Sequence, residues 1–259
     1  MKVATWNVNS IRIREQQVVE WLSRHRVDVL CLQETKVVDR DFPRAAFESL
    51  GYHLSILGQK SYNGVAMLSL QPPESVRLGF ASVSGADADG FDEQKRAIAG
   101  VWGGVRIVNL YVPNGSEAGS EKYDYKLRWL KALKVYLEKL QQSGEELCVC
   151  GDFNVALEDI DIYKPEGREN HIMATPQERQ ALRETLGELK DAFRKFTTEG
   201  GHFSWWDYRA GGFQRNRGWR IDHIYLSSGL YDQATGCHID VKPRQGDQPS
   251  DHAPVIVEF

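Results

Sequence analysis

The sequence predicts a mixed α/β fold in which helices pack on β-sheets. Short apolar runs alternate with stretches of helical periodicity over much of the chain, which is typical of that class. Gly103-Gly104 separates two apolar runs and predicts a β-hairpin, so the sheets are not purely parallel. No internal repeat, low-complexity tract or clear linker divides the 259 residues. We expect a single domain over residues 1–259.

Taken in chain order, the strands are expected where short apolar or β-branched runs occur. These runs are Lys2–Val8, Asp28–Gln33, His53–Leu57, Val65–Ser69, Ile98–Trp102, Val105–Val112, Leu147–Cys150, Ile221–Leu226 and Pro254–Phe259.

Helices are expected between these runs, first over residues 11–24. Residues 121–142 repeat leucine at helical spacing, which indicates core packing. Thr175-Pro176-Gln177-Glu178 predicts a helix start, with Thr175 as N-cap and Glu178 closing a capping box. The polar stretches 84–96 and 160–174 are expected to be long loops, which are often functional in compact domains. The periodic leucines of 121–142 are Leu127, Leu130, Leu133, Leu137 and Leu140.

Composition is that of an ordinary soluble protein, with 41% hydrophobic and 26% charged residues. No apolar run reaches transmembrane length and the N-terminus lacks the apolar core of a signal peptide, so we expect a cytoplasmic protein with no membrane partner. The net charge of −4 neither indicates nor excludes a polyanionic partner. The stretch 208–221 carries four arginines and no acidic residue. Disulfides among the four cysteines are not expected.

The most informative stretch is Gly151-Asp152-Phe153-Asn154, which directly follows an apolar run. If the strand continues, Asp152 and Asn154 project to the same face and can hold a metal ion and a water beside a phosphate. Gly151 would leave room for a close approach by backbone or ligand. The competing interpretation is a turn, because Gly, Asp and Asn are turn residues.

Other strand-like runs also end in acid, amide, imidazole or phenol groups, which favours the metal site over the turn. Strand ends are where ligands collect in α/β proteins. Oxygen ligands without cysteine favour Mg²⁺, or Mn²⁺ in its place, over zinc. With a general base and donors for the extra transition-state charge, such a set suits phosphodiester hydrolysis. Each group taken singly has a structural explanation, such as a solvated strand end for Glu34, a turn for Asp251-His252, or a pair with Arg220 for Asp222.

In this order the motifs resemble the exonuclease III and class II AP endonuclease family, a group of Mg²⁺-dependent DNA-repair enzymes. The resemblance spans the chain and rests on Trp6-Asn7-Val8-Asn9, Leu32-Gln33-Glu34-Thr35-Lys36, Tyr62-Asn63-Gly64-Val65-Ala66, Tyr111-Val112-Pro113-Asn114, Gly151-Asp152-Phe153-Asn154, Thr175-Pro176-Gln177-Glu178-Arg179, Ser204-Trp205-Trp206-Asp207-Tyr208-Arg209, Gly218-Trp219-Arg220-Ile221-Asp222 and Ser250-Asp251-His252-Ala253-Pro254.

The resemblance implies a four-layered α/β sandwich, with two packed mixed sheets flanked by helices and the site at one edge. It implies that Glu34 is the principal Mg²⁺ ligand. Asp152 would orient or deprotonate the attacking water, with Asn154 helping to position it. His252, held by Asp222, would contact the scissile phosphate, and Tyr111 would stabilise the transition state or leaving group. The groups implied to line the metal and phosphate site beside Glu34 are Asn7, Asp152, Asn154, Asp251 and His252.

The same resemblance implies a DNA-binding surface beside the metal. Trp205, Trp219 and Ile221 would form an apolar pocket for an extruded sugar that lacks its base, since flipping costs less where there is no base to unstack or unpair. Both tryptophans could instead be core residues. Arginines of the 208–221 stretch would bind phosphates. The substrate contacts expected are Asn9, Lys36, Asn114, Met173, Arg209 and Arg217, with Arg215 and Arg220 flanking the pocket.

Two departures from the family pattern concern the substrate. Gly115-Ser116-Glu117 stands where some relatives place a basic residue that enters the DNA. His171 or Met173 near the sugar pocket would hinder a flipped abasic residue and shift activity toward trimming of 3′ ends.

The function expected is that of a Mg²⁺-dependent DNA phosphodiesterase of base-excision repair. Its expected activities are 3′→5′ exonuclease on duplex DNA, incision at abasic sites and 3′-phosphatase. Its expected substrate is double-stranded DNA with abasic sites, nicks or blocked 3′ ends, and we expect a monomer. Three alternatives remain, namely an enzyme that trims 3′ ends and incises abasic sites only weakly, a phosphatase acting on lipid or inositol phosphates, and a non-catalytic DNA-binding module.

Overall fold

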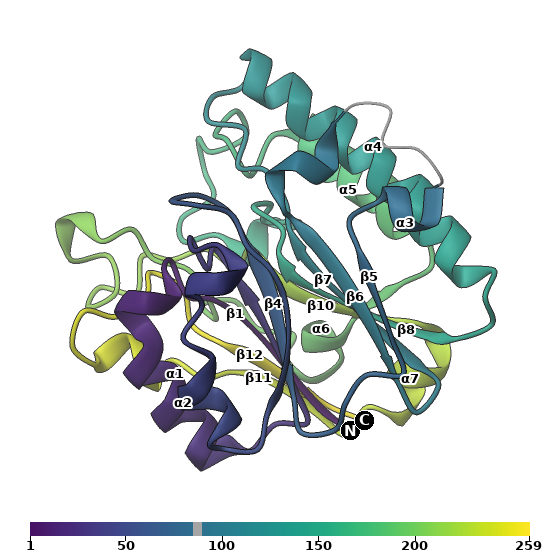
Figure 1. The fold of residues 1–259 in the computed structure, drawn as a ribbon. Coiled ribbons are helices and arrows are strands. Elements are labelled where there is room, and N and C mark those ends of the chain that lie inside the picture. Colours follow the sequence, from purple (N-terminus) through teal and green to yellow (C-terminus); the bar gives the residue numbers. More distant parts are fainter. Residues whose placement is uncertain (85–89) are drawn as a thin grey trace.

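Two β-sheets pack face to face and helices cover both outer faces, which gives four layers (Figure 1). The computed structural model describes residues 1–84 and 90–259. The α/β class and the sandwich of two mixed sheets are thus confirmed. None of the described helices is long and apolar enough to span a membrane.

The first sheet has the strand order β11-β12-β1-β2-β4-β3, and the second has the order β5-β6-β7-β8-β10-β9. The pairs β1–β2 and β7–β8 are parallel, whereas the other pairs are antiparallel. The strands are β1 Lys2–Asn7, β2 Val29–Gln33, β3 His53–Leu57, β4 Val65–Ser69, β5 Ser75–Leu78, β6 Ala97–Trp102, β7 Val105–Tyr111, β8 Glu146–Asp152, β9 Lys190–Asp191, β10 Asp222–Leu226, β11 Gly236–Ile239 and β12 Val255–Glu258.

Three apolar layers hold the sandwich together. One lies between the sheets, one between the first sheet and α1 and α2, and one between the second sheet and α4 and α5. Burial of apolar surface is the main stabilising term of such a core. The helices are α1 Ile11–His25, α2 Arg44–Glu48, α3 Ala81–Ser84, α4 Glu121–Gln141, α5 Pro176–Leu186, α6 Ala192–Phe196 and α7 Ser228–Gln233.

The long elements match their sequence patterns. Each strand expected from an apolar run is present, with ends shifted by at most two residues. Gly103 and Gly104 adopt positive φ in the β6–β7 hairpin. The capping box of α5 is formed, since the backbone N–H of Glu178 donates to Thr175 Oγ1 at 3.2 Å. Of the expected loop 84–96, residues 85–89 lie outside the described part of the chain, and Phe91–Gln94 form a 3-10 turn.

Three strands have no counterpart among the sequence predictions, namely β5, β9 and β11. All lie at sheet edges, where one side of the strand has no partner. Their side chains are largely exposed or partly exposed, so they carry no run of apolar residues to reveal them.

The strand register places functional groups from different segments side by side. Tyr111 at the end of β7 pairs with Asp152 at the end of β8, and Asp152 pairs with Asp222 at the start of β10. In the facing sheet, Asn7 ends β1 next to Gln33, which ends β2. One edge of the sandwich therefore collects side chains from both sheets.

Candidate active site

Three ligand groups converge at this edge. Glu34 follows β2, Asp152 ends β8, and His252 precedes β12; one donor atom from each lies within 4.8 Å of the others. Asp152 and His252 are buried, whereas Glu34 is partly exposed. The carboxylate oxygens of Glu34 and Asp152 at this spacing can hold a divalent metal ion, and the imidazole of His252 lies beside them. The donor set therefore fits a metal, with Glu34 open to a substrate.

Asn7 joins the two carboxylates across the sandwich. Its Nδ2 donates to Glu34 Oε1 and to Asp152 Oδ2, both at 2.9 Å. The side chain is fully buried, so the two bonds are shielded from water. Asn7 thus sets the separation between a group from the first sheet and a group from the second.

His252 is held by a second carboxylate. Its Nδ1 lies 2.8 Å from Asp222 Oδ2, while its Nε2 faces Asp152 Oδ2 at 3.8 Å. Burial alone would lower the pKa of His252, but the charges of Asp222 and Asp152 outweigh it and raise the pKa to about 10. The ring is therefore cationic at neutral pH. Ser204 Oγ fixes the strand start by accepting the backbone N–H of Asp222 at 3.0 Å.

The surroundings of Asp152 favour its neutral, protonated form. Burial, together with the charges of Asp222 and Glu34, raises the pKa of Asp152 to about 7, although His252 opposes the shift. A carboxylate with a pKa near neutrality can accept a proton from water at working pH. Asn154 lies beside it, with its backbone N–H 2.9 Å from Asp152 Oδ1 and its Nδ2 3.2 Å from Oδ2.

Gly151 explains how β8 can deliver Asp152 here. Its φ is 145°, and a Cβ at this position would lie 2.0 Å from the carbonyl oxygen of Leu110. The close approach expected from the sequence is thus made by the backbone of β7. Because no side chain fits, the glycine is required for β7 and β8 to bring Tyr111 and Asp152 together.

Tyr111 is positioned as a neutral donor. Burial and the charge of Glu34 raise the pKa of Tyr111 well above its ordinary value, despite the nearby guanidinium of Arg96. That guanidinium lies 4.6 Å above the centre of the phenol ring. Asn114, three residues further on, is exposed and donates through Nδ2 to Asn154 Oδ1 at 2.9 Å.

A second set of groups lies beside Glu34. Lys36 Nζ is 2.9 Å from Glu34 Oε2 and also donates to Asn9 Oδ1. Asn9 Nδ2 donates in turn to Asp251 Oδ1 at 3.0 Å, and Asp251 Oδ2 accepts from Trp205 Nε1 at 2.9 Å. Lys36 and Asp251 are therefore connected to the metal cluster through hydrogen bonds, and the structure brings all these predicted residues together.

Several of these residues have strained backbone. Glu34 has a φ of 50°, Asn154 of 50° and Met173 of 72°, in the left-handed region that non-glycine residues rarely adopt. Such conformations persist only where surrounding contacts enforce them, and they cluster at functional sites.

The aromatic residues expected to form a sugar pocket do lie together. Trp219, Ile221 and Met173 are buried in one small cluster, with Trp205 packed against it. Backbone pairing of Trp205 with both Trp219 and His252 joins this cluster to the metal site. The ring of His171 lies 5.0 Å from that of Trp219. Met173 is therefore part of this buried cluster, and His171 lies against its edge.

The arginine predictions need correction at Arg220. Its side chain is 1% exposed and is bound by Asp161 and Asp191, so it supports the fold and does not face solvent. A buried guanidinium requires such pairing. Asp222 pairs with His252 and not with Arg220. Arg209 is exposed but lies 2.7 Å from Asp207, and Arg217 is exposed.

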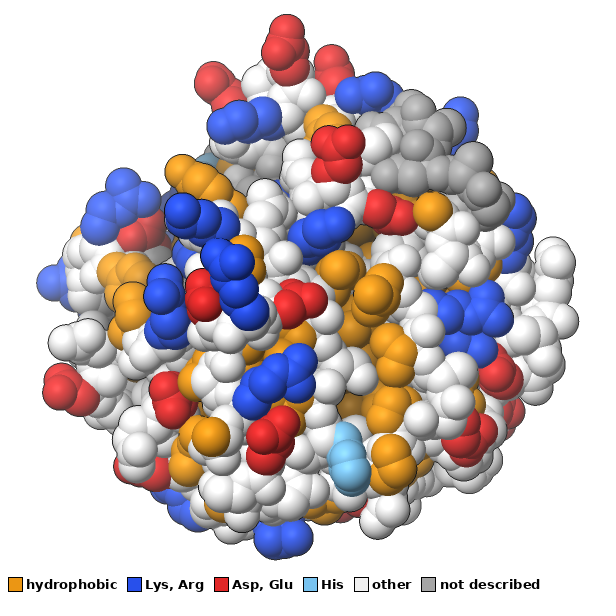
Figure 2. Space-filling model, in the orientation of Figure 1, with side chains coloured by type: hydrophobic (Ala, Val, Ile, Leu, Met, Phe, Trp, Pro, Cys, Tyr) orange, Lys and Arg blue, Asp and Glu red, His pale blue; other side chains and the backbone are white. Residues whose placement is uncertain are grey.

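The molecular surface carries both signs of charge. On the face seen in Figure 2, basic side chains gather mainly on the left, with acidic side chains among them. This local grouping agrees with a chain whose net charge of −4 gives no overall attraction to polyanions.

Sequence reasoning missed Lys126 and Arg96, and it assigned Glu178 only a capping role. Lys126 and Glu178 form a fully buried ion pair directly beneath Asn114 and Asn154. A signal was present, because Lys126 falls on the face of α4 that also carries Tyr123 and Leu130. A lysine on the apolar stripe of a helix indicates a buried charge with a partner.

Comparison with known proteins places the chain in a family. Residues 4–252 match the model of the endonuclease/exonuclease/phosphatase family. Exodeoxyribonuclease III of Haemophilus influenzae is 36% identical, with both chains covered in full. An AP endonuclease from Archaeoglobus fulgidus has a TM-score of 0.94 at 39% identity, covering 100% of this chain and 99% of its own. The 3′ phosphatase NExo from Neisseria, solved with a product DNA hairpin, has a TM-score of 0.93 at 38% identity, with the same coverage.

The fold and the convergent acid–imidazole cluster thus define a hydrolase with a candidate metal site. The chain belongs to the endonuclease/exonuclease/phosphatase family.

Proposed function

We propose that this chain is a Mg²⁺-dependent nuclease of DNA base-excision repair that hydrolyses phosphate esters at 3′ ends and abasic sites of duplex DNA and leaves 3′-hydroxyl groups. The relatives named exodeoxyribonuclease III, AP endonuclease and 3′ phosphatase support this assignment. The observation that carries it is the meeting of Glu34, Asp152 and His252, with Asp222 behind the imidazole.

In this proposal Glu34 is the principal Mg²⁺ ligand, and Asn7, Asp152, Asn154, Asp251 and His252 complete or line the metal and phosphate site. A bound ion would supply positive charge that neutralises the phosphate and favours nucleophilic attack. We assign Mg²⁺ to the site because most of these side chains offer oxygen atoms, which Mg²⁺ prefers as ligands. Mn²⁺ could take its place.

Asp152 takes the proton of the attacking water, a role that suits a pKa of about 7. Asn154, held at Asp152 and at Asn114, orients that water. Protonated His252 donates to a phosphate oxygen, and Asp222 keeps its ring in place. The neutral phenol of Tyr111 donates toward the charge that develops on the phosphate or the leaving oxygen.

A narrower candidate function is trimming of 3′ ends with weak incision at abasic sites. It is favoured by Met173, which is buried among Trp219 and Ile221 and so takes up room in the apolar cluster. A flipped sugar would have to displace it.

The deciding experiment follows hydrolysis of three duplex DNAs, with a 3′-phosphate at a nick, a recessed 3′-hydroxyl end and an internal abasic site, in Mg²⁺ and in EDTA. Wild type is compared with Glu34→Ala, Asp152→Asn and Glu145→Gln, the last being a control just before β8, at the opposite end of that strand from Asp152. Hydrolysis that needs Mg²⁺ and both site carboxylates is expected.

Full activity in EDTA would overturn the metal mechanism. Binding of all three DNAs without any hydrolysis would indicate a non-catalytic module. Release of phosphate from inositol phosphates but from none of the DNAs would assign the chain to the lipid and inositol phosphatases.

A further inference from the structure

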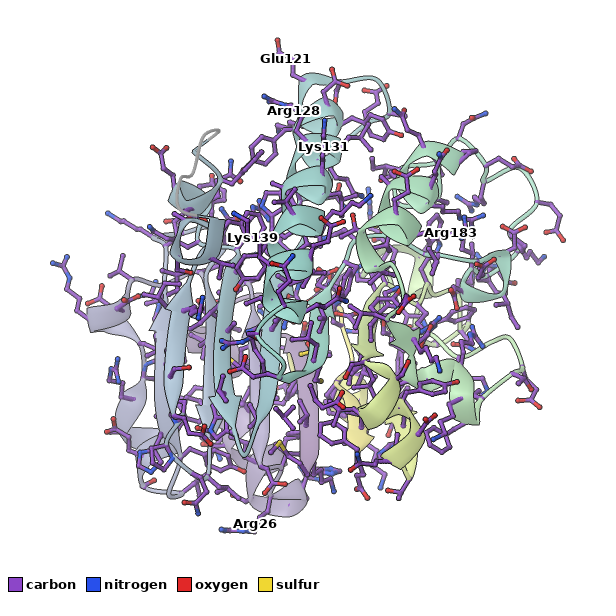
Figure 3. All side chains as sticks on the ribbon, turned by 90° about the vertical axis from the view of Figure 1, so that its right-hand side faces the viewer. Arg26, Glu121, Arg128, Lys131, Lys139 and Arg183 are labelled. Carbon is purple, nitrogen blue, oxygen red and sulfur yellow. The ribbon has the colours of Figure 1, made fainter. Side chains whose placement is uncertain are left out.

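Lys126 and Glu178 form an ion pair that is fully buried, although neither residue borders the metal cluster. Lys126 lies on the inner face of α4, and Glu178 lies in the first turn of α5. Figure 3 shows that Arg128, Lys131 and Lys139 project from the outer side of α4. Lys126 alone among these basic residues turns inward, where its charge needs specific partners.

The remaining donors of Lys126 reach two segments of the site. Its Nζ lies 2.8 Å from the carbonyl oxygen of Asn154 and 3.2 Å from that of Asn114. The side chains of these two asparagines are themselves joined at 2.9 Å. One ammonium group therefore fixes the backbone of both amides that orient the proposed attacking water.

Glu178 reaches a third segment. Its Oε1, besides meeting Lys126, accepts the backbone N–H of Met173 at 3.1 Å, and its Oε2 accepts the N–H of Thr175 at 3.1 Å. The carbonyl of Met173 accepts the N–H of Ala156 at 2.8 Å. Met173 is thus held from both sides in its left-handed conformation, next to the sugar pocket.

Stability alone is a weak reason for such a pair. Burial lowers the pKa of Lys126 while the charge of Glu178 opposes the shift, which reflects the loss of hydration that the pair must offset. An apolar pair of the same volume is often as stable as a buried ion pair. What an apolar pair could not do is hydrogen-bond backbone groups of residues 114, 154 and 173 at once.

We propose that Lys126 and Glu178 are positioning residues, which set the Asn114–Asn154 amides at a fixed place relative to the Met173 side of the sugar pocket. This inference rests on the proposed nuclease function. The pair touches no reacting atom. It acts through the backbone of residues 114, 154 and 173, so that the position of the attacking water and that of the substrate sugar are fixed relative to each other.

The test compares wild type with Lys126→Met, Glu178→Gln and Arg106→Met on duplex DNA bearing a 3′-phosphate. Arg106 is the matched control, because it is a buried cation paired with Glu145 at the opposite end of β7 from Tyr111. We expect Lys126→Met and Glu178→Gln to lower kcat by about 10- to 100-fold, the range for losing a group that orients a catalytic residue. KM should change little, and Arg106→Met should lower stability while retaining the wild-type kcat.

Amide hydrogen exchange gives a readout that does not depend on activity. In folded Lys126→Met or Glu178→Gln, exchange should rise together in residues 153–156 and 171–175, and should stay unchanged in β6. If Lys126→Met does not fold, the isosteric Glu178→Gln answers the same question.

Folded variants with wild-type kcat, or a loss of kcat no larger than that of Arg106→Met, would overturn the positioning role. Increased exchange in only one of the two segments would also overturn it, because the segments would then not be coupled. A wild type that hydrolyses none of the DNAs would overturn the nuclease proposal instead, and the exchange data would still decide the coupling.

Discussion

Nδ1 of His252 lies 2.8 Å from Oδ2 of Asp222, and the pair joins a loop of one sheet to a strand of the other. The other oxygen of Asp222 is buried without a hydrogen-bond partner among the described residues, so this carboxylate is committed to the imidazole. A buried carboxylate in this arrangement fixes the orientation of the ring and favours its charged form.

Asp222→Asn is expected to lower kcat by about 100-fold or more, since losing the carboxylate that orients a catalytic histidine has effects of 10- to 10⁴-fold. The amide oxygen of asparagine can still accept the Nδ1–H, but the amide has no negative charge to stabilise the cationic ring. Steady-state release of phosphate from 3′-phosphate duplex DNA measures the effect, with thermal unfolding to verify folding. An unchanged kcat would show that His252 does not need its partner.

Mg²⁺ is expected to raise the Tm of the wild type, because a ligand that binds only the folded state stabilises it by about 2.7 kcal/mol at 100 times its Kd. Glu34→Gln should abolish the shift, since the amide keeps the shape but lacks the charge. Differential scanning fluorimetry with MgCl₂ and with EDTA measures it. Glu145→Gln serves as the control and should shift like the wild type; an equal shift in Glu34→Gln would remove Glu34 from the metal site.

Gly151→Ala is expected to destabilise the protein by about 2–5 kcal/mol, through overpacking and backbone strain together. The new Cβ would lie 2.0 Å from the carbonyl oxygen of Leu110. Gly144→Ala is a matched control, because Gly144 also has positive φ but has open space at its Cβ position. Urea unfolding compares the two, and equal losses would mean that crowding at β7 plays no part.

His223 predicts a pH dependence of stability. Burial, helped by Arg220, lowers the pKa of His223 below 6.5, and the ring lies 2.9 Å from the carbonyl oxygen of Val155. Below pH 6.5 His223 binds a proton in the unfolded chain but not in the folded chain. Stability is therefore lost as pH falls from 6.5 toward the lower pKa that His223 has in the folded state.

His223→Gln removes this contribution. The stability advantage of the wild type over the variant should therefore shrink from pH 7 to pH 5, by at most about 1.4 kcal/mol per pH unit. Urea unfolding of both proteins at each pH in EDTA measures it. A constant difference would mean that His223 titrates alike in both states.

Met173→Gly is expected to raise incision at an internal abasic site relative to release of a 3′-phosphate. Removing the side chain frees room beside Trp219 and Ile221, and glycine accepts the positive φ of 72° without strain. The ratio of the two rates on matched duplexes is the measurement. If that ratio stays the same in the variant, Met173 does not gate the pocket.

The sequence predicted the long elements, and it indicated which polar residues meet at one edge of the sandwich, because both leave local signals. Apolar runs mark the central strands, and β1, β2, β7 and β8 end in or lead into a polar group with a chemical use, such as Asp152 at the end of β8. The edge strands β5, β9 and β11 left no signal, since a strand with one free side and exposed faces needs no apolar pattern.

Long-range partners were beyond the sequence patterns. Arg220 lies in an arginine-rich stretch next to Trp219, and that position suggested a contact with DNA. In the structure Asp161 and Asp191, which come from distant segments of the chain, bind its guanidinium. Lys126 and Glu178 lie on different helices, and no local pattern shows which buried charge pairs with which.

The left-handed backbone at Glu34, Asn154 and Met173 means that the same positions serve the site and reduce thermal stability. At Glu34 and Met173 this conformation lowers the stability of the fold by on the order of 1–3 kcal/mol each, whereas asparagine tolerates it better. Glycine would relieve the strain at Glu34 but remove a metal ligand. A lineage selected only for thermal stability would therefore tend to lose the site first, whereas one selected for repair must recover that stability in the apolar layers between and outside the sheets.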